Sequence, residues 1–367
     1  MCRKIGHRGP MTQVKLERHY NLLNLPRAGD IDDRTSAYPA MHIITFFDML
    51  HAIVKYLFAM STSTFLKKCG RFGIILRMKK GVLGFDAWYS AAYGARWPAL
   101  KAALLAPRAH VAVYNPYTHV TPAGTTSCVP GITFSHAIAT HWPSPSVTAQ
   151  GLMNYYLLDA ASILPVEALA IQPGERVVDL CAAPGGKSLL CAYKLNGHGV
   201  LIANDRSSTR RLRIQRIMEE YLPESVRQMV QITGHDATRW SLHARDCYDK
   251  VLLDAPCSSE RHLLEHPNEL AQWAPGRTKS LAVTQFAMLA SALDIVKVGG
   301  RIVYSTCALS TLENDDVIAK LHKKRPGRFQ LEHPTFAIGT ETRYGWQVLP
   351  DSDGWGPFYV AVIQRTA

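Results

Sequence analysis

The chain has 367 residues, 47% of them hydrophobic, with eight cysteines and a formal net charge of +12. This length allows roughly two domains, or one large domain with an extension, and the hydrophobic content is ordinary for a globular protein. The cysteines form no CxxC pair and no zinc-type spacing with histidine, which excludes a metal ribbon. No secretory signal opens the chain, so we expect reduced thiols.

Most of the positive charge lies in one segment. Residues 49–158 carry about +9, with Asp86 as the single acid, whereas residues 1–48 carry about +2 and residues 159–367 about +1. Such a segment is typical of contact with a polyanion, so it is a candidate nucleic-acid surface. The alternative is a mitochondrial presequence, because residues 60–80 are basic, rich in Ser and Thr, and free of acids.

The stretch MHIITFFDMLHAIVKYLFAM (41–60) is apolar and about as long as a membrane span. Asp48, His51 and Lys55 would place charged or polar groups in the hydrocarbon, which is costly. We therefore predict an amphipathic or buried helix here, and no membrane span in the chain.

Residues 85–106, FDAWYSAAYGARWPALKAALLA, have helical periodicity, with aromatic side chains between basic ones. Such a surface suits stacked bases and phosphates, although tryptophan at helical spacing is more often part of a core. Residues 107–150 are rich in Pro, Gly, Ser and Thr. This composition indicates a linker or wrapping loop that is not part of a core.

From about residue 152, strands alternate with amphipathic helices, which predicts a Rossmann-like α/β fold with a doubly wound, mostly parallel sheet. Apolar residues at helical spacing predict a helix over 282–296, ended by Gly299 and Gly300. The predicted strands are 175–180, 199–205, 228–236, 248–256, 300–306 and, closing the sheet, 356–364.

The first of these strands leads into VVDLCAAPGGKS (177–188), where a tight Gly-Gly turn precedes a helix that starts near Lys187 or Ser188. Glycines let the backbone approach a ligand, and the amides of a helix N-terminus favour a carboxylate or phosphate. The turn is not GxGxxG, which disfavours a nicotinamide dinucleotide. The candidate cofactor-binding residues of this loop are Cys181, Pro184, Gly185, Gly186 and Lys187.

Acids end three successive strands. Asp205 ends the second strand, where it can accept hydrogen bonds from both ribose hydroxyls, and Arg210 is placed to orient it. Asp236 ends the third strand, where it can receive an adenine amino group, and Asp254 ends the fourth. Each acid alone could equally be a helix cap. The three acids together predict a pocket for S-adenosylmethionine.

Two cysteines follow strand-like runs, Cys257 in KVLLDAPCSS (250–259) and Cys307 in RIVYSTCALS (301–310). A thiol at the carboxyl end of a parallel strand lies where open α/β sheets bind ligands, and two neighbouring thiols can face one substrate. A single cysteine is more often a small buried hydrophobe. The nearby Asp254 favours a site with a cysteine nucleophile.

The motifs DLCAAPGGK, DAPCSS and YSTC, in this order, resemble the Sun-domain (Fmu-like) RNA cytosine-5 methyltransferases over about residues 150–367. Residues 154–165, 258–262 and 356–362 are most similar to the mitochondrial ribosomal member of that family, as are residues 85–105. The resemblance implies S-adenosylmethionine as cofactor, RNA as substrate and a location in the mitochondrial matrix. The predicted organisation is a basic extension over 1–84 with a targeting segment, an RNA- or partner-binding region over 85–150, and a methyltransferase domain over 151–367.

By this resemblance, Cys307 would be the nucleophile that adds to cytosine C6, Asp254 would hydrogen-bond the base near N3, and Cys257 would assist the later elimination. A thiolate needs a positive or hydrogen-bonding environment, for which Lys187 is a candidate. The target base has to leave its stack to reach the thiol. After the first thiol, the family pattern Ser-Gly-Thr-Gly is replaced here by Ser-Ser-Glu-Arg-His (258–262).

The leading hypothesis is therefore a methyltransferase that makes 5-methylcytosine in mitochondrial ribosomal RNA and is linked to ribosome assembly. The alternative is a mainly non-catalytic assembly factor that docks on the mitochondrial ribosomal particle, together with a helical-repeat partner of the termination-factor type. A small-molecule methyltransferase would leave the paired thiols unused. A DNA cytosine methyltransferase would use the Pro-Cys thiol, Cys257, and leave Cys307 idle.

Overall fold

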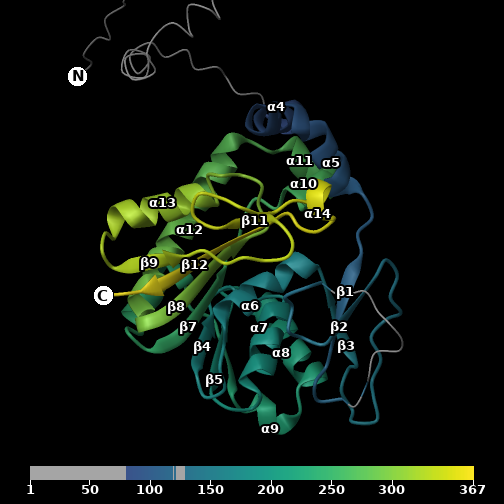
Figure 1. Ribbon diagram of the computed structural model, residues 1–367, viewed down its shortest axis with the longest axis vertical. Coiled ribbons are helices and arrows are strands. Elements are labelled where there is room, and N and C mark those ends of the chain that lie inside the picture. Colours follow the sequence, from purple (N-terminus) through teal and green to yellow (C-terminus); the bar gives the residue numbers. More distant parts are fainter. Residues whose placement is uncertain (1–79, 119, 121–128) are drawn as a thin grey trace, which may run out of the picture. The chain divides into compact units, whose positions relative to one another are not determined.

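The computed structural model describes residues 80–118, 120 and 129–367 (Figure 1). The amphipathic helix predicted over 41–60 lies outside these residues, as does nearly all of the basic segment 60–80. Within the part that is described, no helix is both long and apolar enough to cross a membrane.

A nine-stranded sheet forms the centre of this structure (Figure 1). Its strands are β4 (Arg176–Asp179), β5 (Val200–Asn204), β6 (Val230–Thr233), β7 (Tyr248–Asp254), β8 (Val296–Thr306), β9 (Phe329–Glu332), β10 (Thr340–Glu341), β11 (Trp346–Val348) and β12 (Phe358–Arg365). They lie in the order β10-β11-β12-β8-β7-β4-β5-β6, with β9 paired to β12. Strands β4 to β8 pair in parallel, and β12 pairs antiparallel to β8.

The strand order reverses between β4 and β7, because the chain starts at β4, moves outward to β6 and returns to β7. Such a switch point leaves a crevice at the carboxyl ends of the strands, where ligands bind. The predicted Rossmann-like, mostly parallel fold is confirmed.

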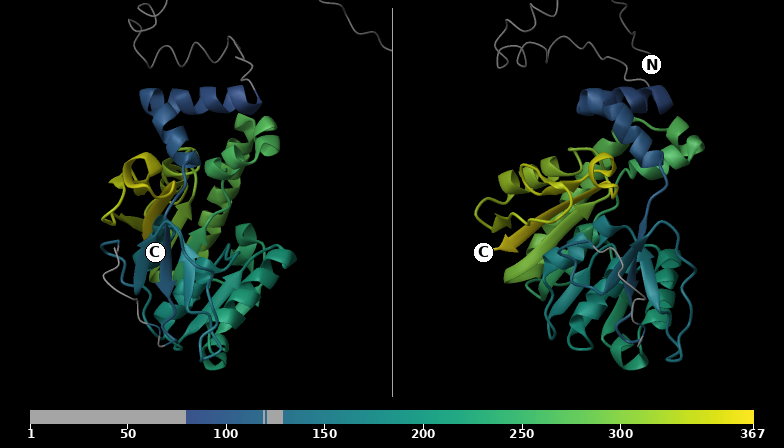
Figure 2. Two further views of the ribbon diagram at one scale, coloured as in Figure 1. Left: turned by 90° about the vertical axis from the view of Figure 1, so that its right-hand side faces the viewer. Right: turned by 45° about the vertical axis from the view of Figure 1, so that its right-hand side comes forward.

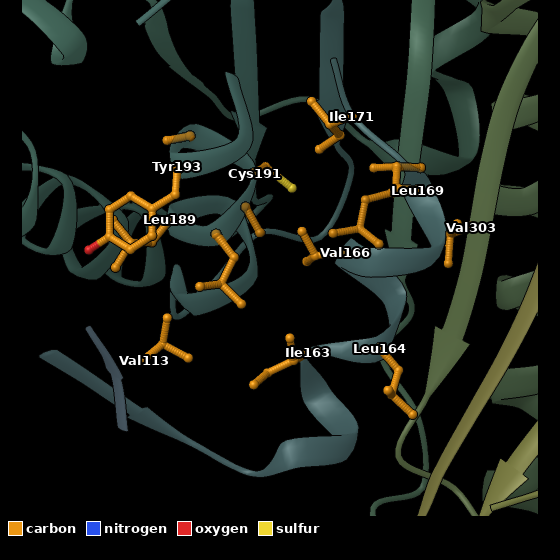
Figure 3. Close-up of a cluster of buried hydrophobic side chains, with 14 of the residues drawn as sticks. Val113, Ile163, Leu164, Val166, Leu169, Ile171, Leu189, Cys191, Tyr193 and Val303 are labelled. Atoms are coloured by element: carbon orange, nitrogen blue, oxygen red, sulfur yellow. The ribbon is translucent and has the colours of Figure 1, made fainter. Parts of the chain in front are cut away.

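Alternate residues of the central strands enter two separate cores, one on each face of the sheet. On β4, Val177 packs into the first core and Val178 into the second. Figure 3 shows the first core, where Ile163 and Val166 lie near Leu189. The helices in the first core are α6 (Leu164–Leu169), α7 (Gly186–Leu195) and α8 (Ser208–Tyr221), followed in the chain by the short α9 (Glu224–Arg227); those in the second are α12 (Pro275–Ile295) and α13 (Asp315–Lys324).

A second, three-stranded antiparallel sheet lies in the region that the sequence indicated to be a linker. Its strands are β1 (His110–Tyr114), β2 (His136–Ala139) and β3 (Tyr155–Leu158), in the order β2-β1-β3. Val111 and Val113 are fully buried in the same core as α7 (Figure 3). The interpretation of 107–150 as a loop outside the core is therefore wrong. The run HVAVY has the alternation of a strand, but the Pro, Gly, Ser and Thr around it outweighed that signal.

The helical prediction for 85–106 is confirmed by α4 (Gly81–Tyr93) and α5 (Trp97–Leu105), which a 3₁₀ turn joins. Their aromatic side chains belong to a third core: Phe85 and Tyr89 are fully buried, and the ring centroids of Phe85 and Trp273 lie 5.5 Å apart. This core includes residues of α10 (Glu260–Glu265) and α11 (Pro267–Ala271). Figure 2 shows the two blue helices beside this green segment. The two helices therefore pack on the segment that follows Cys257.

The helix predicted over 282–296 ends earlier than its glycines indicated. α12 ends at Ile295, and Val296 already pairs with Tyr248 as the first residue of β8. The register between β7 and β8 shifts directly after that pair, and Gly299 has a φ of +81°, which favours glycine. Gly299 thus belongs to an irregularity within the strand and does not stop the helix.

A substitution of Leu189 in α7 tests the packing of the first core, because this side chain is 0% exposed. We expect Leu189→Ala to lower the free energy of unfolding by about 2–5 kcal/mol, since the deletion leaves a cavity. The matched control is Leu212→Ala on α8, where the leucine is 66% exposed and the expected change is within about 0.5 kcal/mol. Urea unfolding followed by circular dichroism measures both; equal midpoints for the two variants would contradict this core.

Candidate active site

The ends of two adjacent parallel strands bring the two cysteines together. Asp254 at the end of β7 pairs in register with Ser305 of β8, so the segments that follow both strands leave the same edge of the sheet. The Sγ atoms of Cys257 and Cys307 lie 3.1 Å apart. The hydroxyl oxygen of Ser259 lies 3.2 Å from the Cys307 sulfur.

The contact between the thiols makes their acidities unequal. The hydrogen bond with Cys257 lowers the pKa of Cys307. Burial opposes this effect, and the hydrogen bond with Ser259 adds to it. The bond between the two thiols raises the pKa of Cys257, and burial raises it further. This direction favours Cys257 as the donor in the contact and Cys307 as the thiol that ionises first.

Asp254 is held between a hydroxyl and an ammonium group. Ser305 donates to Asp254 Oδ1 at 2.8 Å, and Lys187 Nζ lies 2.8 Å from Oδ2. Burial lowers the pKa of Lys187, but the attraction of Asp254 outweighs it, so the net shift is upward. Lys187 Nζ also lies 5.1 Å from the ring centroid of Phe358. A positive charge is thus fixed beside the thiols.

A cavity of about 280 Å³ opens on Cys307. Its lining is partly apolar and contains two arginines, a histidine and two carboxyl groups, so charged groups of both signs face a ligand there. The lining residues are Arg108, Asp159, Ser162, Ser259, Arg261, His262, Glu265, Cys307, Gly356, Pro357 and Phe358.

A second cavity, of about 170 Å³, shares Ser162 with the first and lies at the carboxyl end of β4. It is lined by Tyr156, Leu157, Leu158, Ser162, Asp179, Cys181, Ala182, Ala183, Pro184, Gly186, Lys187 and Asp254. Five of the predicted cofactor residues are in this set: Cys181, Pro184, Gly186, Lys187 and Asp254. Four are outside it: Gly185, Asp205, Arg210 and Asp236.

The Gly-Gly turn keeps this second cavity open. Gly185 has a φ of +126°, a conformation that L side chains rarely adopt. A Cβ atom on Gly186 would lie 2.7 Å from Cε1 of Tyr156, which lines the cavity. The residues present fit S-adenosylmethionine, because the N-terminal amides of α7 suit its carboxylate and the acids suit its cationic centres.

Asp205 and Asp236 have local partners. Asp205 accepts a hydrogen bond from the amide of Ser207 at 2.9 Å and pairs with Arg210 at 3.1 Å. Asp236 accepts from the amide of Thr238 at 2.9 Å and caps the 3₁₀ helix Ala237–Leu242. Asp236 therefore has the cap geometry that the sequence left as an alternative. The contacts of both acids with a nucleoside stay predictions.

Asp179 is the site residue that the sequence pattern missed. It is buried at the end of β4, and Ser188 donates to its Oδ2 at 2.6 Å. Burial raises the pKa of Asp179 to about 7, although the bond from Ser188 opposes the shift. The signal was present in VVDLCAAPGGKS, because Asp179 ends the first strand as Asp205 and Asp254 end later ones.

The thiol pair predicts how a variant of Cys257 behaves. Cys257→Ala removes the hydrogen bond that lowers the pKa of Cys307, so alkylation of Cys307 by iodoacetamide is expected to need a higher pH. Cys257→Ser keeps a donor and is expected to stay near the wild-type profile. Peptide mass spectrometry across a pH series measures the labelled fraction. Identical profiles for the alanine and serine variants would contradict the proton arrangement.

Asp179 predicts a pH dependence of stability. Its pKa is about 7 when folded against an ordinary 3.8, so the unfolded chain loses the proton first, and the carboxyl increasingly destabilises the fold as the pH rises through this window. The melting temperature of Asp179→Asn minus that of the wild type should therefore grow between about pH 4 and 7 and level off above.

The matched control for this pH series is Asp249→Asn. The pKa of Asp249 is lowered: burial opposes the shift, and hydrogen bonds from Lys297 and the Arg176 amide outweigh it. Asp249 is thus ionised in both states above its ordinary pKa of 3.8, so its stabilising contribution is constant there and is lost only at lower pH. A difference for Asp179→Asn that does not change with pH would contradict the raised pKa.

Comparison with known proteins identifies the family. The model of the family described as 16S rRNA methyltransferase RsmB/F matches residues 166–364. The 5-cytosine rRNA methyltransferase NSUN4 of Mus musculus is 35% identical over 333 residues, which cover 77% of this chain and 87% of that protein. The mitochondrial tRNA (cytosine(34)-C(5))-methyltransferase of Danio rerio is 36% identical over 261 residues, covering 68% of this chain and 71% of that protein.

Among solved structures, NSun6 from Pyrococcus horikoshii with SFG has a TM-score of 0.61 at 18% identity, covering 77% of this chain and 97% of that one. This likeness supports the fold. Together the comparisons confirm the predicted family, class of enzyme and cofactor. The family model covers more than half of the chain, and the mouse relative aligns over most of its own length. The chain belongs to the 16S rRNA methyltransferase RsmB/F family.

Proposed function

We propose that this protein makes 5-methylcytosine in mitochondrial ribosomal RNA through a covalent bond between Cys307 Sγ and cytosine C6. The observation that carries the proposal is the thiol pair: the sulfur of Cys307 lies 3.1 Å from that of Cys257, its pKa is lowered by this contact, and it lines a cavity. The name of the mouse relative, a 5-cytosine rRNA methyltransferase, supports the substrate and the position of the methyl group.

In the addition step, the Cys307 thiolate attacks C6 and forms the S–C6 bond, while the electron pair of the C5–C6 double bond moves to C5. Asp254, held by Ser305 and Lys187, would accept a hydrogen bond from the base near N3 and stabilise N3 in its protonated form, which draws electrons from the C5–C6 bond. S-adenosylmethionine, when bound in the neighbouring cavity, supplies a methyl group to an electron-rich carbon. Tyr156, Lys187 and Asp254 line that cavity and would orient it.

The elimination step uses the second thiol. Once Cys307 is bonded to C6 it carries no negative charge, so the hydrogen bond and the repulsion from Cys307 that raise the pKa of Cys257 are lost, although the effect of burial remains. Cys257 can then release its proton to water. The Cys257 thiolate then takes the proton on C5. The S–C6 bond breaks, the C5–C6 double bond returns, and Cys307 leaves as a thiolate that again accepts a hydrogen bond from Cys257.

The cavity at Cys307 would hold a cytosine that has left its stack. Arg108 and His262 are among its lining residues and would contact the attached phosphates. We propose further that the protein acts in the mitochondrial matrix on the ribosomal particle, with a helical-repeat partner of the termination-factor type. The name of the mitochondrial relative supports the compartment, and the basic segment 49–158 supports contact with RNA.

RNA bisulfite sequencing tests the function. Mitochondrial and cytosolic RNA is compared between cells that express the wild type and cells that express Cys307→Ala at an equal level. We expect one methylated cytosine of the mitochondrial ribosomal RNA to be lost in the variant. A covalent RNA adduct that survives denaturing gels is expected with Cys257→Ala and not with Cys307→Ala, because only the former adds to C6 and fails to leave.

Other outcomes of this test are informative. Loss of methylation only in a transfer RNA would reject the ribosomal substrate and keep the chemistry. Unchanged methylation at every cytosine, with no adduct in either variant, would reject the catalytic proposal as a whole.

A further inference from the structure

A buried carboxylate connects the two catalytic loops to the N-terminal helices. Glu260 is the first residue of α10 and 0% exposed. Its Oε1 accepts hydrogen bonds from Tyr89 Oη and Ser258 Oγ, and its Oε2 accepts one from the amide of Leu309 at 2.9 Å. Glu260 belongs to the segment 258–262, where this chain departs from the family pattern.

The three donors come from three separate parts of the chain. Ser258 follows Cys257 directly, Leu309 is two residues beyond Cys307, and Tyr89 lies on α4. A buried carboxylate is costly unless hydrogen bonds replace its hydration, so each donor is held firmly by the charge. Tyr93 of α4 adds a contact to the same loop, because its hydroxyl donates to the carbonyl oxygen of Leu309 at 2.8 Å.

A second buried acid supports the same loop from the other side. Glu313 Oε2 accepts from the amide of Ser258 and from Gln285 Nε2, each at 2.9 Å. Burial, followed by repulsion from Glu260, raises the pKa of Glu313 to about 7. Two carboxyl groups thus hold Ser258, the residue next to Cys257.

We propose that Glu260 is a positioning residue for methyl transfer, which fixes the two sulfur atoms relative to each other by tying both of their loops to Tyr89. This inference rests on the proposed function, because it concerns the same two thiols. It makes α4 a part of the catalytic apparatus, although α4 lies outside the segment that matches the family model.

The negative charge of Glu260 gives the proposal a signature that a merely structural contact lacks. This charge raises the pKa of Cys307, a smaller effect than the hydrogen bond from Cys257 that lowers it. Removing the charge should ease ionisation of Cys307. Removing the Tyr89 donor should hinder it, because the two loops would no longer be tied so that their sulfur atoms stay within hydrogen-bonding distance. The titratable groups around Glu260 and Cys307 are Tyr89, Tyr93, Glu313, Cys257, Asp254 and Lys187. The cavity at Cys307 adds Arg108, Asp159, Arg261, His262 and Glu265.

The test compares Glu260→Gln and Tyr89→Phe with Tyr221→Phe. Glutamine fits the site, because its amide oxygen can accept from Leu309 and its amide nitrogen can donate to the two hydroxyls. Tyr221→Phe is the matched control, since its buried hydroxyl donates to the carbonyl oxygen of Tyr155, at a distance of 3.1 Å, and to neither thiol loop. Iodoacetamide labelling of Cys307 against pH, single-turnover methylation of RNA and melting temperature are measured for each variant.

We expect the labelling profile of Cys307 to shift to lower pH in Glu260→Gln and to higher pH in Tyr89→Phe, with the control unchanged. Single-turnover methylation should fall about ten-fold in both test variants, the size expected from losing a hydrogen bond to a charged group, while KM for S-adenosylmethionine stays within about two-fold. Labelling profiles and methylation rates equal to those of Tyr221→Phe would overturn the proposal, whatever the melting temperatures.

The two readouts separate this inference from the proposed function. Alkylation of Cys307 requires no RNA, so opposite shifts with a wild type that does not methylate would reject the function and keep the positioning role. Coincident labelling profiles with an active wild type would reject the positioning role alone.

Discussion

The hydrogen bond between Cys257 and Cys307 is the interaction on which the rest of the site depends. It exists because β7 and β8 run parallel and in register, so that the loops leaving both strands meet at 3.1 Å. It also gives chemically identical side chains different acidities, and the proposed mechanism uses this difference by making Cys257 the proton donor and Cys307 the nucleophile. In the neighbouring cavity, the ion pair of Lys187 and Asp254 forms part of the wall.

The fold supplies this contact by stacking two cores on the central sheet and adding a third around α4 and α5. The third core contains no residue of the parallel strands, yet it includes Leu263, six residues after Cys257, and Leu309, two residues after Cys307. Tyr89 and Leu309 therefore both pack in this core and donate hydrogen bonds to the buried carboxylate of Glu260. The small sheet β2-β1-β3 also helps to form the site, because Tyr156 of β3 lines the second cavity.

The sequence alone predicted the central strands, because long apolar runs that end in Asp or Cys are local patterns. It also placed Lys187 and the Gly-Gly turn correctly at the start of α7. The strand β1 escaped detection, because HVAVY is short and its surroundings have the composition of a loop. The bond between Glu260 and Tyr89 joins residues 171 positions apart, so no spacing rule could reveal it. The role of Asp236 could not be decided from the sequence, because aspartate is common both as a helix cap and as a ligand for a nucleoside.

The extent of the third core has a consequence for what counts as one folding unit. The family model begins at residue 166, but the described residues from 80 to 367 belong to a single compact unit. A shortened protein that began at residue 151 would lack α4 and α5 and would expose Leu263, Leu270 and Trp273 to water. Uncovered apolar surface of this kind promotes self-association, so such a fragment would aggregate before its chemistry could be assessed. The segment that matches the family model is thus smaller than the compact unit that contains it.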